Sequence, residues 1–466
     1  MMQDLMVRIP HLSEQIFQKL NHKSLFKCRE AARSWQNIID ERNYPWLRIV
    51  NIPTILKRRN TYLHLSAKTG QIEVFKIGLN KEGDKNIQNE LGETPFHYAC
   101  QNRRLKMVEF LLQNNDLEIG INSKDNHVID LNAKTKCGNT ALCYACFKGH
   151  ADVVKILMKN ASYLSIDDAW KGFYWACQEG HSDVVKILIE NATILSINFN
   201  IGNNDGTTAF HKACERGFSD VVKIIMENAA ILSIDLNRTD NEGLTGLHWA
   251  CLCYQSNVVK AVINSEISNH FKEKKQLTPS SIILESALRI DLNRKDKYGD
   301  TAFHYLCLTG NSELVNIFIE NAAILSLNFN IRNNDGMTAF HIVCDSGFSD
   351  AVEIIMENAA TLNINLNREN TNKNTALHLA CNRGHLDVIK ILMENAATLS
   401  IDLNRKNSNG KTPFHVACQK SHSDVVKVFM ENASALSIDL NKKMITMLQV
   451  SIWHAKSVIQ KWSRFS

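Results

Sequence analysis

A 37-residue repeat is the feature that most constrains how this chain can fold. Its most regular markers are cysteines spaced by 37 residues, interrupted once: Cys177, Cys214, Cys251, Cys307, Cys344, Cys381 and Cys418. The step from Cys251 to Cys307 is 56 residues, which is one period plus 19 inserted residues. Earlier copies are less regular, and we count about ten between roughly residues 61 and 441. A period of this length is typical of a solenoid, in which each copy packs only on its neighbours.

Each copy reads as two short helices separated by a break. The first helix opens on Thr followed by Ala or Pro, as in "GKTPFHVAC" at 410–418, and Thr is a favourable N-cap. Pro95 and Pro413 fall at the first helical position, where a missing N–H costs nothing. The break carries Gly-His or Gly-Phe, and "DVVKILM" then begins the second helix, with Asp or Ser expected to cap it. Neither helix is long enough to be stable alone, so the pattern predicts an all-α solenoid of stacked helix-turn-helix copies.

The repeat resembles the ankyrin repeat. The resemblance rests on two motifs, Thr-Pro-x-His-x-Ala and then Gly-His-x-x-Val-Val-x-x-Leu. The repeats that contain them cover about 380 of the 466 residues. Cys stands where many ankyrin repeats have Ala, and the period is 37 rather than about 33. The extra residues fall in "ENAAILSIDLN", where Ala229 and Ala396 replace a helix-ending Gly. Because Ala propagates a helix, we expect the second helix to be about one turn longer and to continue past Asn228 and Asn395.

The recurring His and Cys, three residues apart, raise the question of metal sites or Cys/His active sites. The pairs are His97/Cys100, His211/Cys214, His248/Cys251, His304/Cys307, His341/Cys344, His378/Cys381 and His415/Cys418. Zinc needs four converging ligands, whereas neighbouring pairs lie roughly 8–10 Å apart. The same spacing is too long for disulfides, and a nucleophilic Cys needs an exposed, electropositive setting. We therefore expect each Cys to pack as a small apolar side chain.

Two further expectations concern these side chains. The ankyrin resemblance implies that the His bonds to the backbone and to neighbouring Thr residues across repeats. Cys143 and Cys146 form one Cys-x-x-Cys, and Cys143 takes the His place of its copy. Packing is the favoured interpretation for this pair as well, with redox chemistry as the alternative.

The first sixty residues have a different pattern. Apolar residues spaced by three and four predict two or three amphipathic helices with a break at "NHKS". The segment resembles an F-box over about 40 residues: Ile-Phe-x-x-Leu, a polar turn with a Leu, then Cys-Arg and a Trp before Ile-Ile. The family's opening Leu-Pro corresponds to Ile9-Pro10, one residue out of register. The expected adaptor-binding positions are Ile9, Pro10, Leu12, Ile16, Phe17, Leu20, Leu25 and Trp35.

The two resemblances together imply a substrate-recognition subunit of a Skp–cullin–F-box ubiquitin ligase. The F-box-like helices would bind a Skp-type adaptor and through it the cullin complex, and the repeats would hold a protein substrate. Such a chain performs no chemistry, so we expect no catalytic residue, cofactor or metal. The alternative is an ankyrin scaffold or regulatory adaptor whose N-terminal helices only cap the array. An enzyme is not supported, because there is no glycine-rich phosphate loop and no triad outside the repeat.

Charge and hydropathy exclude other partners. A formal net charge of +5, from 53 basic and 48 acidic residues, is too mild to indicate nucleic acid. No run approaches the roughly 18 apolar residues of a membrane span. The start, "MMQDLMVRIPHLSEQ", has no apolar signal-peptide core, so we expect a cytoplasmic or nuclear protein with 13 reduced cysteines.

These patterns divide the chain into an F-box-like domain (1–55), an ankyrin array (56–441) and a C-terminal helical cap (442–466). The expected repeats lie at about 61–90, 91–137, 138–167, 168–205, 206–242, 243–298, 299–335, 336–372, 373–409 and 410–441. The 19 inserted residues between Cys251 and Cys307 are expected to form a loop or short helix outside the stack.

A row of arginines is the candidate substrate contact within the array. Arg238, Arg294, Arg368 and Arg405 each lie 13 residues before the Cys of their copy, so they share one phase of the solenoid. Ile201 and Ile331 interrupt the row. Arginines in a polar turn are usually only solvated, which is the favoured interpretation; the alternative is that this basic edge holds an acidic partner segment through paired hydrogen bonds.

Overall fold

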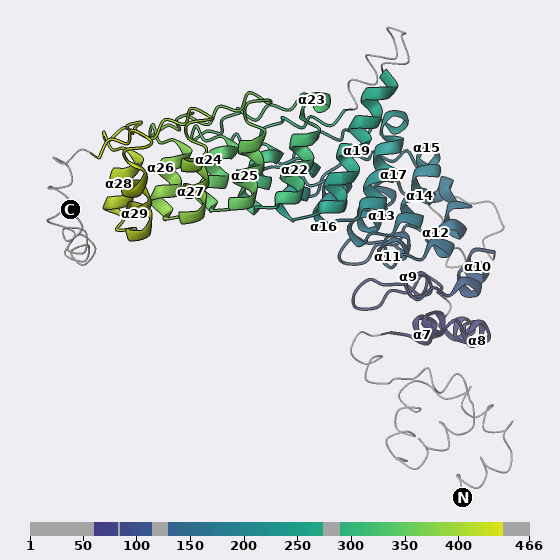
Figure 1. Ribbon diagram of the computed structural model, residues 1–466. Coiled ribbons are helices and arrows are strands. Elements are labelled where there is room, and N and C mark those ends of the chain that lie inside the picture. The colour runs from purple at the N-terminus through teal and green to yellow at the C-terminus, as the bar shows by residue number, and fades with distance from the viewer. Residues whose placement is uncertain (1–59, 83, 114–128, 274–288, 441–466) are drawn as a thin grey trace, which may run out of the picture. The chain divides into compact units, whose positions relative to one another are not determined.

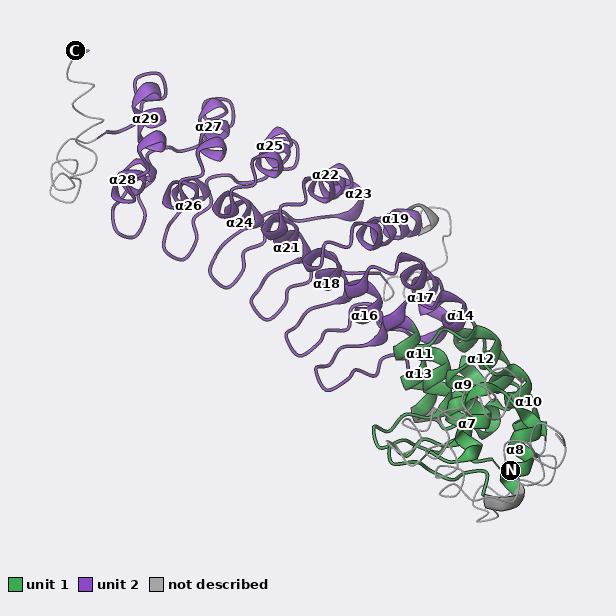
Figure 2. Ribbon diagram, turned by 90° about the horizontal axis from the view of Figure 1, so that it is seen from below, with its two compact units in different colours: residues 1–176, 186–197 green, residues 177–185, 198–466 purple. Residues whose placement is uncertain are grey.

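The computed structural model describes residues 60–82, 84–113, 129–273 and 289–440 (Figure 1). The predicted F-box-like domain at 1–55 and the predicted cap at 442–466 lie outside these residues. The chain divides into two compact units, one of residues 1–176 and 186–197 and one of residues 177–185 and 198–466 (Figure 2). The described residues form α-helices and one short 3-10 helix, with no strand, which confirms the all-α prediction.

The first unit contains pairs of short antiparallel helices joined by tight turns. The pairs are α7 (Tyr62–Thr69) with α8 (Ile72–Glu82), α9 (Pro95–Gln101) with α10 (Leu105–Gln113), and α11 (Ala141–Phe147) with α12 (Ala151–Met158). A 3-10 turn, η1 (Ala161–Tyr163), and the helices α13 (Ile166–Glu179), α14 (Ser182–Glu190) and α15 (Ala192–Leu195) follow, with α13 and α14 divided between the two units.

The second unit has two layers of helices. The inner layer is α16 (Ala209–Arg216), α18 (Gly246–Leu252), α21 (Ala302–Thr309), α24 (Ala339–Ser346), α26 (Ala376–Arg383) and α28 (Pro413–Gln419). The outer layer is α17 (Ser219–Leu232), α19 (Ser256–Glu273), α22 (Ser312–Glu320), α25 (Ser349–Glu357), α27 (Leu386–Glu394) and α29 (Ser423–Asn432), and a one-turn helix α23 (Ala322–Leu325) follows α22. Long loops project from the inner layer on the side away from the outer layer (Figure 2).

The inner helices begin as the sequence predicts, and the outer ones do not. Thr375 and Thr412 are N-caps, and Pro413 stands in the first turn of α28. Several outer helices have an aromatic ring at the N-cap instead of the expected Asp or Ser, for example Phe218 before α17 and His385 before α27, and neither side chain caps the helix. The His385 ring bonds to the preceding copy instead, because Nε2 donates to the Asp345 carbonyl at 2.8 Å. Helix α22 differs: its N-cap Asn311 accepts from the Leu314 N–H at 3.1 Å.

The prediction of a longer second helix is wrong for most copies. Helix α17 does continue past Asn228 to Leu232, but α27 ends at Glu394, with Asn395 as its C-cap. The Asn395 side chain donates to the Ile391 carbonyl at 2.9 Å, the same oxygen that the Asn395 backbone N–H uses. Asn228 makes the same kind of bond, to the Ile224 carbonyl at 2.8 Å, within the continuing helix α17, so this bond alone does not end α27. After Asn395 the extra residues form a separate turn, which closes with Ile401 N–H donating to the Ala396 carbonyl at 2.9 Å.

Most of the inserted segment falls at residues 274–288, which lie outside the described residues, so its expected place as a loop or short helix outside the stack stays a prediction. Helix α19 is 18 residues long and ends at Glu273, immediately before this gap. Glu266 stands 37 residues after Ala229, at a regular position of the repeat. It is buried, and its carboxylate accepts from the Ile290 backbone N–H at 3.2 Å.

Candidate protein-binding surface

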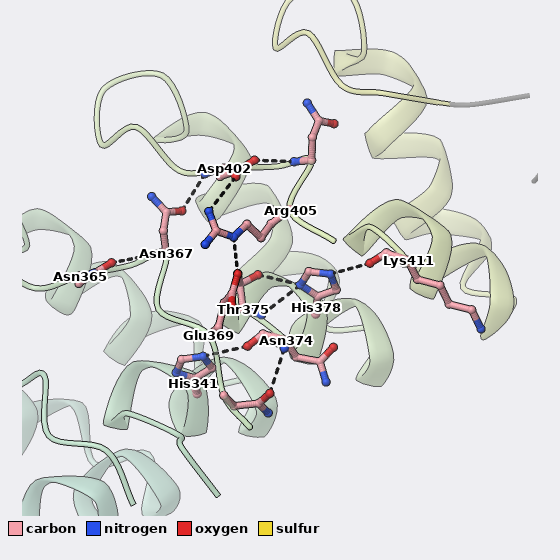
Figure 3. A network of polar contacts seen from close by, with 12 residues as sticks. His341, Asn365, Asn367, Glu369, Asn374, Thr375, His378, Asp402, Arg405 and Lys411 are labelled. Carbon is pink, nitrogen blue, oxygen red and sulfur yellow. Dashed lines mark hydrogen bonds and ion pairs between the residues drawn. The ribbon is translucent and has the colours of Figure 1, made fainter. Parts of the chain in front are cut away.

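In inner helices α16, α18, α21, α24 and α26, the histidine joins two copies through its ring. In α26, His378 Nδ1 accepts from the Thr375 backbone N–H at 3.1 Å, which fixes the neutral tautomer with the proton on Nε2 (Figure 3). His378 Nε2 then donates to the Lys411 carbonyl of the next copy at 3.0 Å. The equivalent His341 bonds to Thr338 and to the Asn374 carbonyl. The Thr partner is thus the N-cap of the same helix rather than a residue across repeats, while the backbone partner lies across repeats.

Burial explains why these rings do not titrate near neutrality. Removal from water lowers the pKa of His304 and of His341 to about 4, against the opposing effect of their bonds to backbone carbonyls. Protonation of Nδ1 would also remove the acceptor that the Thr backbone N–H uses.

The cysteines of the repeat pack, as the sequence indicates. Cys214, Cys307 and Cys381 are fully buried free thiols. Burial raises the pKa of Cys214 and Cys307 far above its ordinary value, and the thiolate that a nucleophile requires is therefore disfavoured. Cys143 is also buried, accepting from Thr140 at 3.5 Å in the place of the histidine. Among the described residues, no group of three or more His, Cys, Asp or Glu side chains could hold a metal ion.

The projecting loops of the second unit end in tight hairpins, which we call fingers: 203–207, 240–244, 296–300, 333–337, 370–374 and 407–411. Each finger is closed on itself; in one, Asn370 N–H donates to the Asn374 carbonyl at 2.9 Å. Adjacent fingers are also joined by backbone bonds, such as Thr371 N–H to the Asp335 carbonyl at 3.0 Å. The fingers therefore form a continuous row beside the inner helices.

A second row of bonds, which the sequence analysis missed, uses the Asn that ends "DLN", "NFN" or "NLN". We call it the asparagine ladder, and in the second unit it comprises Asn200, Asn237, Asn293, Asn330, Asn367 and Asn404. Asn367 Nδ2 donates to the Ser400 carbonyl at 2.8 Å, and its Oδ1 accepts from the Asp402 N–H at 2.7 Å (Figure 3). The available signal was this Asn recurring at the 37-residue period.

One face of each inner helix turns toward the fingers, and we call it the finger-side face. It carries the side chains one and four positions after the histidine. Trp249 Nε1 donates to Asp240 of its finger at 2.9 Å, and the Tyr305 hydroxyl donates to Asp296 at 2.7 Å. These bonds fix the fingers to the helices and orient both rings along the face.

The centre of this face is apolar and its borders are ion-paired. The finger-side cluster consists of Trp249, Leu252, Tyr305 and Leu308, on α18 and α21. Leu308 is 49 % exposed, which is high for a leucine in a helix that is otherwise largely buried. On one border Lys212 pairs with Glu215 at 2.6 Å, and on the other Arg383 forms two bonds of 3.1 Å to Asp345.

An apolar centre surrounded by satisfied polar groups is the anatomy of a protein interface. The ankyrin resemblance implies binding through hairpin tips and the exposed face of the first helices, and the structure locates a candidate surface of this kind on particular residues. The only signal in the sequence was the run of large apolar residues one position after the histidine.

The arginines of the predicted basic edge lie at the bases of the fingers, but they differ in exposure and in ion pairing. Arg238, Arg294 and Arg405 are exposed, whereas Arg368 is half-buried. Arg405 pairs with Glu369 of the preceding copy and lies 3.7 Å from Asp402 (Figure 3). Arg238 and Arg294 make no ion pair with a described residue. The acidic-partner role of this row stays a prediction, and the adaptor-binding positions from Ile9 to Trp35 lie outside the described residues.

Known proteins match this chain through its repeats. The human transient receptor potential cation channel subfamily A member 1 is 27 % identical over 114 residues, 24 % of this chain and 9 % of the channel. An ankyrin repeat protein of Acanthamoeba polyphaga mimivirus is 26 % identical over 166 residues, 27 % of this chain and 22 % of that protein. The chain thus spans under a quarter of the length of these two relatives. An ankyrin repeat protein of Rickettsia bellii is 31 % identical over 114 residues, which are 24 % of this chain and 60 % of that protein.

Among solved structures, the ankyrin repeat domain of Bcl-3 aligns with a TM-score of 0.42 and 20 % identity, covering 55 % of this chain and 97 % of that one. No described helix is both long and apolar enough to cross a membrane. The family model for ankyrin repeats (3 copies) matches residues 46–125, 121–198, 173–273, 280–367 and 361–444. With most of its length covered by this model and its described residues folded as stacked helix pairs, the chain belongs to the ankyrin-repeat family.

Proposed function

We propose that this protein is a non-catalytic scaffold that holds a protein partner on the finger-side face of its second unit, and that its N-terminal segment connects this partner to a ubiquitin ligase. Ankyrin repeats are protein-interaction modules, and the family model that matches the chain is theirs. The observation that supports this surface is the finger-side cluster, because exposed leucine and half-exposed aromatic side chains are held there by a rigid backbone. Interfaces gain most of their affinity from such buried aromatic and aliphatic anchors.

Leu308→Asp tests the surface without disturbing the finger, because the Leu308 side chain makes no bond to one. We expect it to weaken partner capture by about 2 kcal/mol or more, since a charge would then be desolvated in the interface. Ile231→Asp is the matched control, because Ile231 is 82 % exposed and lies on outer helix α17. Quantitative affinity purification compares the two variants with the wild type. Equal capture by all three proteins would rule out the finger-side cluster as the binding site.

The ubiquitin-ligase role rests on the F-box-like sequence of residues 9–39. In this proposal Ile16, Phe17 and Leu20 contribute to binding a Skp-type adaptor, and the adaptor brings the cullin complex to the partner held by the repeats. Ubiquitin transfer then depends on proximity, and its chemistry belongs to other subunits. Removing residues 1–55 should abolish recovery of the adaptor and the cullin while the array still recovers its own partner.

A further inference from the structure

The last described repeat leaves one buried hydrogen-bond donor unused. In α28, His415 Nδ1 accepts from the Thr412 N–H at 3.2 Å, so Nε2 carries the ring proton as in the other copies. His415 is 4 % exposed, yet its Nε2 has no hydrogen-bond partner among the described residues. His211, His341 and His378 all use this atom to donate to the carbonyl that lies 33 residues further on. The unused N–H therefore points to a missing carbonyl at the end of the array.

Apolar positions of the last described copy are more exposed than their equivalents in the preceding copy. Cys418 is partly exposed, whereas Cys381, its equivalent in the preceding copy, is fully buried. Met430 is 40 % exposed, whereas its equivalent Met393 is 3 % exposed. Each preceding copy has these positions covered by the copy that follows. We call His415, Cys418, Val426 and Met430 the end face.

The chain runs directly from this face into a segment that repeats the inner-helix motif. It is held on the array as far as Asp439, whose N–H donates to Asn404 Oδ1 at 2.7 Å. Asn441 and Lys442 then stand 37 residues after Asn404 and Arg405. "TMLQVSI" at 446–452 parallels "TPFHVAC" at 412–418, with Thr at the N-cap and Gln449 at the histidine position. Gln at that position completes a capping box as His does.

We infer that the end face binds residues 446–462 of this same chain, with the Ile445 carbonyl accepting from His415 Nε2. Ile445 precedes Thr446 as Lys411 precedes Thr412, and Lys411 supplies the carbonyl that His378 uses. The interval from His415 to Ile445 is three residues shorter than the usual 33. A shorter interval also occurs in the first copy, where His64 bonds to the Glu93 carbonyl only 29 residues away. Leu448 takes the place of Phe414, which is buried. This inference is independent of the proposed ligase function.

Thiol labelling of Cys418 in the full chain tests the inference. If 446–462 covers the end face, Cys418 reacts with iodoacetamide at least about tenfold more slowly than it does in Leu448→Asp, because the thiol is reached only through local opening. His454→Asp is the matched control. His454 parallels Lys420 of the preceding copy, which is exposed, so the same charge is added at a position where Cys418 should stay protected. Exposed Cys137 and buried Cys381 provide fast and slow references within each sample, read by peptide mass spectrometry.

Three outcomes overturn the inference. One is equal labelling of Cys418 in the wild type and in Leu448→Asp. Another is protection that appears only as protein concentration rises, which would assign the end face to a second copy. The third is protection that requires vesicles of anionic lipid, the rival partner suggested by five basic and no acidic residues in 442–466. A change in Cys381 labelling would show that a variant has unfolded the array, and Val450→Asp then serves as a second variant.

Discussion

The glycine between the two helices of a copy lies under an aromatic ring of the next copy. Gly384 has φ +79°, and a Cβ built there would lie 2.7 Å from the His422 ring. His422 Nε2 donates to the Asn382 carbonyl at 3.2 Å, and His385 makes the same kind of bond to Asp345 at 2.8 Å. The Gly-His pair of the sequence is therefore one contact between copies: the glycine leaves room for the ring, and the ring bonds to the end of the inner helix.

Gly384→Ala and Gly410→Ala separate backbone strain from this contact. Gly410 also has a positive φ, +70°, but a Cβ there meets nothing within 4 Å. Both substitutions should cost about 1 kcal/mol for the left-handed backbone, and Gly384→Ala should cost roughly 1–3 kcal/mol more for displacing the ring. The free energy of unfolding from urea titration measures both. If the two variants lose the same stability, the His422 ring does not pack on Gly384 in solution.

At the scale of elements, the extra residues after each outer helix form a turn. The carbonyl at the end of this turn accepts from an asparagine of the ladder. Ser400 and Ser437 adopt positive φ values of 51° at the end of this turn, and their carbonyls accept from Asn367 and Asn404. A 37-residue copy thus has a row of side-chain bonds that joins the turns following the outer helices, in addition to the row that joins the fingers.

Asn330→Ala should weaken the array at one interface between copies. Asn330 Nδ2 donates to the Asn363 carbonyl at 2.8 Å, and Oδ1 accepts from the Asn365 N–H at 2.8 Å. Loss of two such bonds should cost about 1–3 kcal/mol, less than a buried pair because the site is partly hydrated. Hydrogen exchange should show a faster Asn365 amide in the variant, while the finger amide of Thr371 stays protected. An unchanged rate at Asn365 would mean that the ladder contributes nothing to the interface.

The sequence predicted which helices form better than it predicted where the outer helices end. Thr caps, Pro413 and the buried cysteines follow from local rules, because each depends on neighbours within one helix. The end of α27 at Glu394 did not follow from helix propensity, because Ala396 favours a helix. The Asn395 side-chain bond does not explain it either, since Asn228 makes the same bond and α17 continues past it. The finger-side cluster could not be found from single copies either, because it is assembled from Trp249 and Tyr305 on successive inner helices.

At the scale of the whole molecule, the row of neutral histidines makes the array sensitive to acid. The folded-state pKa of His304 and of His341 is about 4, below the ordinary value of 6.5, so the unfolded chain binds more protons between these limits. Stability is then fully present above about pH 6.5 and is lost as the pH falls toward 4. Each such histidine adds a slope of at most ~1.4 kcal/mol per pH unit in this window.

His341→Gln tests this pH dependence. Gln retains the capping box and does not titrate, so the variant should lose stability less steeply than the wild type between pH 7 and pH 5. Urea midpoints at several pH values measure the slopes. Parallel pH profiles for the two proteins would exclude His341 as a source of the acid sensitivity.

The central claim is that one chain joins a protein-binding array to a ubiquitin-ligase adaptor. Affinity purification with quantitative mass spectrometry tests it most directly, using the wild type, a double variant Ile16→Asp with Phe17→Asp, and Gln18→Glu as the matched control. We expect the wild type and the control to recover a Skp-type adaptor and a cullin, and the double variant to lose both while retaining the partner bound by the repeats, because the array is stabilised by contacts between neighbouring copies. Adaptor and cullin recovered equally by the double variant, or by none of the three proteins, would contradict the account.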